Sequence, residues 1–453
     1  MKGALFLLVW SLICWVCHGQ QGGIATEEYH LPFPMQSCDS SGCQEEATTI
    51  VIDADVRQMY SAADSSVSCQ TGQGWDSELC PDGITCAENC ALDGIDEAGY
   101  QSIYGATSDG ETIDFKYLTE SSYGTSIGGR LYLLASENEY RLFKMKNREF
   151  TIDVDTSQLP CGLNGAVFFV EMEGDGGVSS YPSNSAGAKY GTGYCDAQCP
   201  TYLRVIAGEV NIGQSNYGIC CGELDIWEAN SAAQTYTFHT CTSEGYYPCQ
   251  GVDCGSDATG DHYNGVCDKD GCEFGAYRMN QHEYYGPDSS FDVDSSQPIT
   301  VVTQFLTEDG TDEGDLVEMR RLYVQNNQVI RNTRVNFEGI PDYDSITDEF
   351  CNDYKELFGE VPDFAAKGGL QSMGEALDRG MVLVLCLWED YSNHMQWLDG
   401  ISPADGDPSD PGVLRGPCPA DSGRPGQMHQ NYPDAYVRYS NVKFGTINST
   451  FTL

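Results

Sequence analysis

The sequence predicts an all-β fold, a sandwich of two antiparallel sheets with long loops and few short helices. Several segments are rich in β-branched and aromatic residues, and Phe150, Ile152 and Val154 alternate with polar residues as in a half-buried strand. Fifty glycines and many Asp-Gly and Asn-Gly pairs supply turns. Short strands joined by long loops are typical of sandwiches with an elaborated surface.

The strands are expected, in chain order, at 49–54, 130–135, 149–155, 166–171, 299–305, 318–325, 381–388 and 436–444. One helix is expected at 348–358, where Phe350, Tyr354 and Leu357 share a face. Thr347 can cap its start and Gly359 can end it. The length permits two or three domains, but no linker or repeat divides the chain. We therefore expect one domain over 20–453, without an additional binding module.

The N-terminus has the pattern of a secretory signal peptide over residues 1–19. Lys2 precedes an apolar run from Ala4 to Cys17, and small residues surround the expected cleavage after Gly19. The run is short for a membrane span, and no later run is long enough. The sequence thus predicts a secreted, extracellular protein with no membrane partner, which we expect to be a monomer.

Charge and cysteine content agree with secretion and with a neutral substrate. The formal net charge of −45 repels nucleic acid and anionic membranes, so neither is expected as a partner. Removal of Cys14 and Cys17 with the signal leaves nineteen of the 21 cysteines, which suits disulfides and one leftover thiol. Because secreted cysteines are mostly oxidised, a zinc site is a poor alternative. We expect no metal and no cofactor.

The most informative stretch lies at residues 220–230, where Glu223, Asp225 and Glu228 fall within six residues. Residues two apart in a strand share a face, so Glu223 and Asp225 do. Glu228 is five residues after Glu223, so in a regular strand its side chain would point to the opposite face. If all three serve one site, the strand must bulge or turn near Trp227.

Crowded carboxylates have pKa values that move apart, so one can remain protonated while another is ionised. Glycoside hydrolysis requires this division between an acid and a nucleophile. The spacing alone is equally compatible with a solvated acidic strand in a very acidic protein.

The motif Glu-x-Asp-x-x-Glu followed by Ala-Asn, with Cys220-Cys221 upstream, resembles the signature of glycoside hydrolase family 7. The resemblance extends from about Tyr29 to about Thr450. Members of this family are cellulases, either reducing-end cellobiohydrolases or endoglucanases. The resemblance implies a curved concanavalin-like β-jelly roll whose loops wall a cleft or tunnel. It also implies a cellulose chain as substrate and cellobiose as product.

By position in the motif, the resemblance implies that Glu223 is the nucleophile and Glu228 the acid/base. Asp225 would tune Glu223, and His239 matches a histidine beside the cleaved bond, although an ordinary histidine is usually structural. In this retaining mechanism the two glutamate carboxyls are expected about 5–5.5 Å apart.

The resemblance further implies three groups of substrate-binding residues. Polar side chains would line the glycone side: Asn164, Asp196 and Gln198. Tryptophans would stack on sugar rings: Trp388 and Trp397. A product-side cluster would grip the departing cellobiose: His262, Asp270, Glu273, Arg278 and Arg415. The alternatives are loop polarity, core packing and surface ion pairs of small energetic consequence.

Nine disulfides are implied by the resemblance: Cys38–Cys43, Cys69–Cys90, Cys80–Cys86, Cys161–Cys418, Cys195–Cys221, Cys199–Cys220, Cys241–Cys267, Cys249–Cys254 and Cys272–Cys351. Cys386 remains, and its apolar surroundings in sequence predict a buried, inert thiol. Asn448 lies in the glycosylation sequon Asn-Ser-Thr.

Several positions depart from the family pattern. Val56 and Gln58 replace entrance tryptophans, and Phe168 replaces a tyrosine. His262 replaces a common arginine, which predicts a weaker, pH-dependent grip on product.

Loop length bears on whether the enzyme attacks chain ends or chain interiors. The segments 251–273, 339–367 and 400–418 are long, as in cellobiohydrolases, whereas the segment between Cys199 and Cys220 is short. We therefore favour a reducing-end cellobiohydrolase, with an endo-β-1,4-glucanase as the alternative. A non-catalytic glucan-binding protein is a distant third reading, because sandwiches of this kind also serve lectins.

Overall fold

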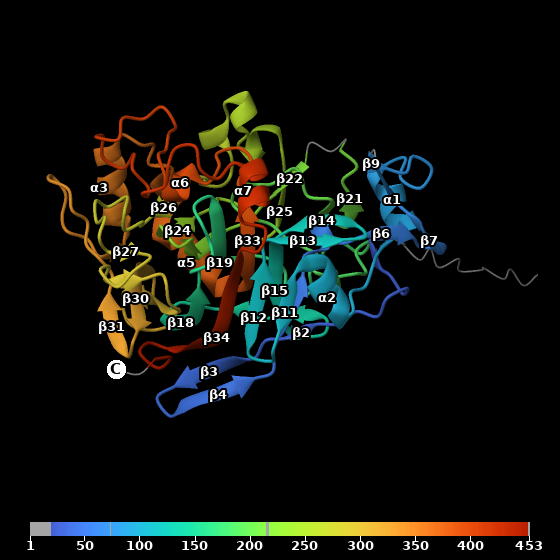
Figure 1. Cartoon of the computed structure of the whole chain (residues 1–453), viewed down its shortest axis with the longest axis horizontal. Helices are drawn as coiled ribbons and strands as arrows, with labels where there is room; N and C mark the ends of the chain where they lie inside the picture. Colours follow the sequence, from blue (N-terminus) through green and yellow to red (C-terminus); the bar gives the residue numbers. More distant parts are fainter. Residues whose placement is uncertain (1–19, 73, 214–216, 452–453) are drawn as a thin grey trace, which may run out of the picture.

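The computed structural model describes residues 20–72, 74–213 and 217–451, so the expected signal peptide lies outside the described residues. Most of this chain is strand, arranged in two ten-stranded sheets and several small ones (Figure 1). Pairing in the large sheets is antiparallel except where β3 joins β34. This is the jelly-roll sandwich expected from the sequence.

One large sheet is called here the outer sheet. Its strands are β3 (Met35–Asp39), β4 (Gly42–Glu46), β11 (Ala106–Ser108), β12 (Thr112–Lys116), β18 (Arg148–Asp155), β29 (Ile299–Thr307), β30 (Leu316–Gln325), β31 (Gln328–Arg331), β32 (Ser345–Ile346) and β34 (Tyr436–Thr446).

The other large sheet is called the inner sheet. Its strands are β2 (Leu31–Pro32), β5 (Thr49–Ile52), β15 (Gly129–Ser136), β16 (Glu139–Tyr140), β17 (Leu142–Phe143), β19 (Leu163–Val170), β23 (Glu223–Ala229), β24 (Gln234–His239), β26 (Cys272–Glu273) and β33 (Met381–Glu389). Its main path runs β2-β5-β15-β33-β19-β23-β24-β26.

The main core lies between the two sheets. Phe150 and Ile152 of β18 are fully buried there and belong to one apolar cluster with Leu383 and Leu385 of β33. Burying such side chains contributes roughly 1.5–3 kcal/mol each. Every strand predicted from the sequence is present, with ends shifted by a few residues, because apolar alternation marks a buried strand more sharply than it marks its ends.

The helix α3 (Asp348–Phe358) has the predicted bounds and caps. The Thr347 hydroxyl accepts from the Phe350 N–H, and Gly359 takes the left-handed conformation with φ of 70°. Six further helices of the described chain were not predicted: α1 (Gly83–Asn89), α2 (Glu97–Tyr104), α4 (Asp363–Ala366), α5 (Gly369–Arg379), α6 (Gln396–Asp399) and α7 (Pro425–Asn431). None of the described helices is long and apolar enough to cross a membrane.

One four-stranded sheet, β1-β10-β6-β7, and five two-stranded sheets lie outside the two large sheets. They comprise β1 (Gln21–Gly22), β6 (Met59–Ser61), β7 (Asp64–Ser68), β8 (Gln70–Thr71), β9 (Gly74–Trp75), β10 (Cys90–Leu92), β13 (Leu118–Ser121), β14 (Gly124–Ile127), β20 (Val205–Ile206), β21 (Glu209–Val210), β22 (Tyr217–Cys220), β25 (Tyr247–Gln250), β27 (Tyr285–Gly286) and β28 (Val293–Asp294). Figure 1 shows α1, β6 and β7 at one end of the long axis and α3, β30 and β31 at the other.

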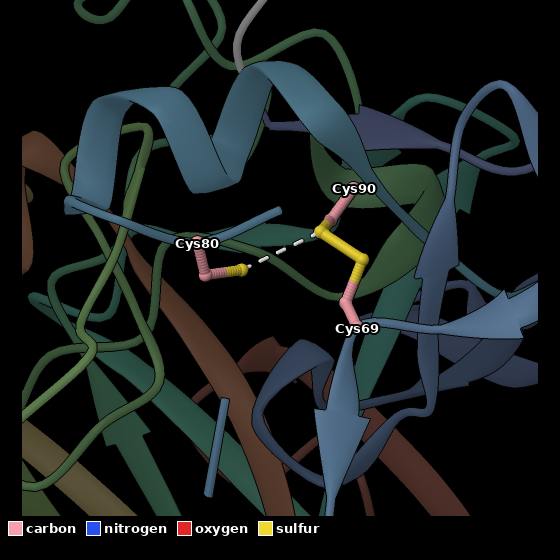
Figure 2. Close-up of side chains that lie close together, drawn as sticks. All are labelled: Cys69, Cys80 and Cys90. Atoms are coloured by element: carbon pink, nitrogen blue, oxygen red, sulfur yellow. Dashed lines mark hydrogen bonds between the residues drawn. A yellow bond between two sulfur atoms is a disulfide. The ribbon is translucent and has the colours of Figure 1, made fainter. Parts of the chain in front are cut away.

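All nine expected disulfides are formed, and Cys386 is the free, buried cysteine of the described chain. Figure 2 shows the Cys69–Cys90 bridge with the sulfur of Cys80, itself bonded to Cys86, 3.6 Å from that of Cys90. These two bridges hold α1 at the end of the molecule. A Cβ on Gly83 would lie 2.5 Å from the Val210 carbonyl oxygen, so glycine is required where α1 meets β21.

Candidate active site

The strand β23 contains the bulge that the carboxylate spacing predicts. Against β24, Asp225 pairs with Thr237 and Glu228 with Thr235, so two residues of β23 face one residue of β24. The two residues of this bulge, Ile226 and Trp227, are both buried in the core between the sheets. Glu228 therefore returns to the face that carries Glu223 and Asp225.

Four predicted catalytic side chains lie on the inner face, which is the face of the inner sheet that points away from the core between the sheets. Glu223 pairs with His239 across β23 and β24, and side-chain atoms of Glu223, Asp225 and His239 lie within 4.8 Å of one another. The Ala197 N–H donates to Glu223 Oε2 at 3.0 Å, and Asn164 Nδ2 donates to Glu228 Oε1 at 2.9 Å. The cluster is thus held by donors from two separate segments.

The proton on His239 can be assigned from its partners. Nδ1 lies 2.9 Å from the Asp268 carbonyl oxygen, which can only accept, so Nδ1 carries a proton. Nε2 then faces Asp225 Oδ2 at 3.3 Å. This arrangement suits either a protonated Asp225 beside neutral imidazole or an imidazolium beside the carboxylate.

The three carboxyls all have pKa values raised well above their usual range. Burial is the main cause for each, and the charge of Asp225 further raises the pKa of Glu223 and of Glu228. Each is less than a tenth exposed. These shifts favour the protonated forms and depend on one another, so an acid and an ionised carboxylate can coexist within the cluster.

A row of directly paired residues crosses the inner sheet through Glu228 and shows in which direction the site extends. Glu228 pairs with Ala166, Ala166 with Cys386, and Cys386 with Arg130 of β15. On the other side Glu228 pairs with Thr235, whose hydroxyl donates to Glu273 Oε1 at 3.1 Å. Directly paired residues share a face, so this row runs from Arg130, past the small Cys386 and Ala166, to Glu273.

The predicted glycone residues have different surroundings. Asn164 pairs with Trp388 and donates a hydrogen bond to Glu228, so it lies beside the predicted acid/base. Asp196 is buried and accepts from the Tyr194 hydroxyl at 2.7 Å. Gln198 is exposed, and it exchanges hydrogen bonds of 2.9 and 2.7 Å with Lys269, which joins two loops beside the carboxylates.

The two predicted platforms lie together. The rings of Trp388 and Trp397 have centroids 6.1 Å apart and planes 28° apart, and both are half-buried. Asp390 Oδ2 accepts from Trp397 Nε1 at 3.2 Å and fixes that ring. The alternative of full core packing does not describe either tryptophan.

Within the predicted product-side cluster, Glu273 and Arg278 are buried and Arg415 is half-buried, so surface ion pairs do not describe these three residues. Glu273 Oε2 accepts from Arg278 at 2.7 Å and from Arg415 at 2.8 Å. Arg278 also pairs with Glu360 and donates through Nε to the Gly412 carbonyl at 3.3 Å. Arg278 consequently joins the three long loops at 251–273, 339–367 and 400–418.

His262 and Asp270 lie on the outer part of this side. His262 Nε2 is 2.9 Å from Asp270, and Nδ1 is 2.5 Å from Asp257. The hydrogen bond with Asp270, together with the other carboxylate, raises the pKa of His262. The histidine therefore stays cationic to higher pH than an ordinary histidine. Its weaker grip on product stays a prediction.

Sequence reasoning missed Arg130 and the aromatic residues around it. Arg130 forms an ion pair with Asp53 at 2.5 Å, and its guanidinium lies 3.9 Å from the Tyr194 ring centroid. Its place in a strand otherwise rich in apolar residues was the signal, because a charge there must point into a polar site or be paired.

A strand of the inner sheet that carries three buried carboxyls, with two half-buried tryptophans and the cluster of Glu273 and Arg278 on the same side of the fold, defines an enzyme of the glycoside hydrolase class. The model of glycosyl hydrolase family 7 matches residues 22–451. This chain belongs to glycosyl hydrolase family 7.

Similar proteins include an exoglucanase and several enzymes of solved structure. An exoglucanase GH7B of Limnoria quadripunctata is 49% identical over 447 residues, which cover 96% of this chain and 97% of that protein. The crystal structure of a family 7 cellobiohydrolase from Daphnia pulex is 48% identical, with a TM-score of 0.93, over 95% of this chain and 100% of that one.

Two less similar solved structures represent two kinds of cellulase, a cellobiohydrolase and an endocellulase. The Melanocarpus albomyces cellobiohydrolase complexed with cellotetraose is 36% identical, with a TM-score of 0.89, over 96% of this chain and 100% of that one. The Humicola insolens endocellulase is also 36% identical, but its TM-score is 0.81, over 95% of this chain and 100% of that one.

Proposed function

We propose that this enzyme is a secreted cellobiohydrolase that releases cellobiose from the reducing ends of cellulose chains with retention of configuration. The observation that carries the proposal is the convergence of three long loops on buried Arg278 and Glu273. Loops joined in this way enclose the product side, and an enclosed site favours attack at a chain end over attack in the interior.

The comparison of solved structures supports the same choice. At equal identity of 36%, this chain superposes better on a cellobiohydrolase than on an endocellulase, with TM-scores of 0.89 and 0.81. The backbone of this chain as a whole therefore resembles that cellobiohydrolase more closely than that endocellulase, which supports the proposal.

In the proposed mechanism Glu223 attacks the anomeric carbon and forms a glycosyl-enzyme. Glu228, held by Asn164, protonates the leaving oxygen and then accepts a proton from the attacking water. Asp225 shares a proton with Glu223, and His239 orients Asp225. Trp388 and Trp397 would stack on sugar rings, and Arg278 and Arg415 would bind the departing cellobiose.

The wider setting is part of the proposal. Nine disulfides suit an oxidising, extracellular compartment. Cleavage after residue 19 would leave a single catalytic domain at 20–453, acting as a monomer. Intact-mass analysis and size-exclusion chromatography of the secreted protein test both statements.

The product profile on microcrystalline cellulose tests the main proposal. We expect cellobiose to dominate, with few new reducing ends on the insoluble fraction and little viscosity loss on a soluble cellulose derivative. Mixed oligomers and many insoluble ends would instead identify an endoglucanase, the outcome that the short Cys199–Cys220 segment favours. The variant Glu223→Gln should keep the fold and lose turnover, and turnover without Glu223 would refute the catalytic assignment.

A further inference from the structure

The short Cys199–Cys220 segment carries an exposed aromatic ring that has no part in the site described above. Tyr202 has 69% of its side chain exposed, whereas its neighbour Leu203 is buried at 2%. Most large rings of the described chain are packed, so a ring this open is either a surface accident or a contact surface. Its surroundings distinguish these two cases.

The segment that carries Tyr202 is anchored near Arg130, at the end of the row opposite Glu273. Two residues after Tyr202, the Arg204 N–H donates to Asp55, and the Asp55 N–H donates to Asp53, the ion-pair partner of Arg130. Arg130, Asp196 and Asp55 are the charged groups that act on the Tyr202 hydroxyl. Arg130 ends the row that contains Glu228, three strand steps away. At about 4.8 Å for each step, Arg130 is roughly 14 Å from Glu228 along the direction of the site, and the segment of Tyr202 lies at that end.

Tyr202 is accessible and yet closely surrounded. The residue is 69% exposed, and burial by neighbouring groups nevertheless raises its pKa to about 12. A residue in the wall of a hollow combines these two properties, because solvent reaches it while protein surrounds it.

The backbone on both sides of this ring is fixed. Cys199 is bonded to Cys220, and the Arg204 N–H donates to Asp55. Arg204 also donates to the Arg57 carbonyl oxygen at 3.0 Å. Farther along the same segment, β21 packs on α1, which two disulfides hold; Figure 1 shows β21 beside α1, away from β26 and α6. A ring held in advance loses little entropy when a ligand covers it.

We propose that Tyr202 is a stacking platform for a sugar ring of the glucan chain on the glycone side, remote from the cleaved bond. This inference rests on the proposed function, because it takes the cellulose chain as ligand. Sugar rings have apolar faces that pack on aromatic rings, and the Arg130 and Asp196 side chains beside Tyr202 can bind the hydroxyl edge of the same ring. Tyr202 would then favour long chains over short ones.

Binding to inactive enzyme tests the inference. In the Glu223→Gln background, calorimetry measures the affinity for cellohexaose and for cellotriose. By analogy with stacked bases, we expect Tyr202→Ala to weaken cellohexaose binding about fivefold to a hundredfold and to leave cellotriose binding unchanged. Tyr202→Trp should retain cellohexaose affinity, because it keeps a ring. Tyr432→Ala, which removes a 45% exposed tyrosine after α7, is the matched control.

The outcomes separate this inference from the proposed function. If the Glu223→Gln parent binds neither oligosaccharide, the proposed substrate class is wrong. If the parent binds both and Tyr202→Ala matches it on cellohexaose, the platform is refuted and the function stands. A loss that is equal for the two oligosaccharides, or that Tyr432→Ala reproduces, would also refute the platform.

Discussion

The variant Asn164→Ala isolates the hydrogen bond that tunes the proposed acid/base. Asn164 Nδ2 donates to Glu228 Oε1 at 2.9 Å, within a site where both side chains are buried. This bond stabilises the ionised carboxylate and opposes the burial that raises the pKa of Glu228. Loss of the donor should therefore raise that pKa further.

The size of the change follows from the type of bond. A hydrogen bond to a charged group contributes about 1.5–3 kcal/mol, and about 1.4 kcal/mol corresponds to one pKa unit. Asn164→Ala should thus move the pKa of Glu228 up by about 1–2 units. Because Glu228 must be protonated to act as the acid, the alkaline limb of kcat/KM should move to higher pH by the same amount.

The assay is the pH profile of kcat/KM on a soluble chromogenic cellobioside. Asn336→Ala is the control, because the exposed Asn336 amide bonds only a loop carbonyl, that of Asn280. Since Asn164 Oδ1 also accepts from the Ala229 N–H at 3.0 Å, a stability loss of about 1–3 kcal/mol should accompany the shift. An alkaline limb that stays in place or moves to lower pH would refute the reasoning.

Three further predictions concern the product side and the free thiol. Glu273→Gln should lower the free energy of unfolding in urea by about 3–5 kcal/mol, because Arg278 and Arg415 lose their buried counter-charge. Burial alone would raise the pKa of Glu273, but the two arginines bring it below its usual value. The stability that these ion pairs contribute is therefore present at pH values above the usual glutamate pKa, and it is lost as the pH falls through the lowered pKa of the folded enzyme. The ion pairs of His262 raise its pKa, so they are fully present at pH values below the ordinary histidine pKa and are lost as the pH rises through the raised pKa of the folded enzyme. Cellobiose inhibition should therefore weaken as the pH rises through that range, and His262→Gln should remove this pH dependence. Burial raises the pKa of Cys386 to about 12, so the native enzyme should resist alkylation at pH 8 and the unfolded enzyme should react once.

Each of these has a contrasting measurement. Glu318→Gln, in an exposed pair with Arg320, should cost no more than about 1 kcal/mol, and a loss equal to that of Glu273→Gln would contradict the buried-charge argument. Cellobiose inhibition that is equally strong across the pH window in the wild-type enzyme would show that His262 does not contact product. Rapid alkylation of the native enzyme would show that the inner face opens at Cys386.

The sequence predicted those parts of the molecule in which local pattern and tertiary structure agree. Alternating apolar residues located β18, and the capped apolar face located α3. The opposite parity of Glu223 and Glu228 predicted the bulge that β23 contains. In each case the spacing of residues along one strand or helix was sufficient to predict the feature.

The remaining features depend on contacts between distant segments. The caps Asp82 and Asp96 precede α1 and α2 in the sequence, but these helices are too short to show a period. In α5, Leu370, Met373 and Leu377 are spaced as in a helix, yet Gly374 interrupts the run. The roles of Arg130 and Tyr202 appear only when a loop packs against the row of paired residues.

The bulge at Ile226 also means that the path of the strand matters more here than the identity of the bulged side chain. If β23 kept all its residues but ran as a regular strand, Glu228 would turn from the hollow into the apolar core, without a partner for its charge. Replacing Ile226 by valine should cost only about 0.5–1.5 kcal/mol. A sandwich with the same residues in β23 and no bulge would bind glucan at most. Transfer of this chemistry to another scaffold therefore requires β23 together with β19 and β24, because the bulge is formed by the way β23 pairs with these two strands.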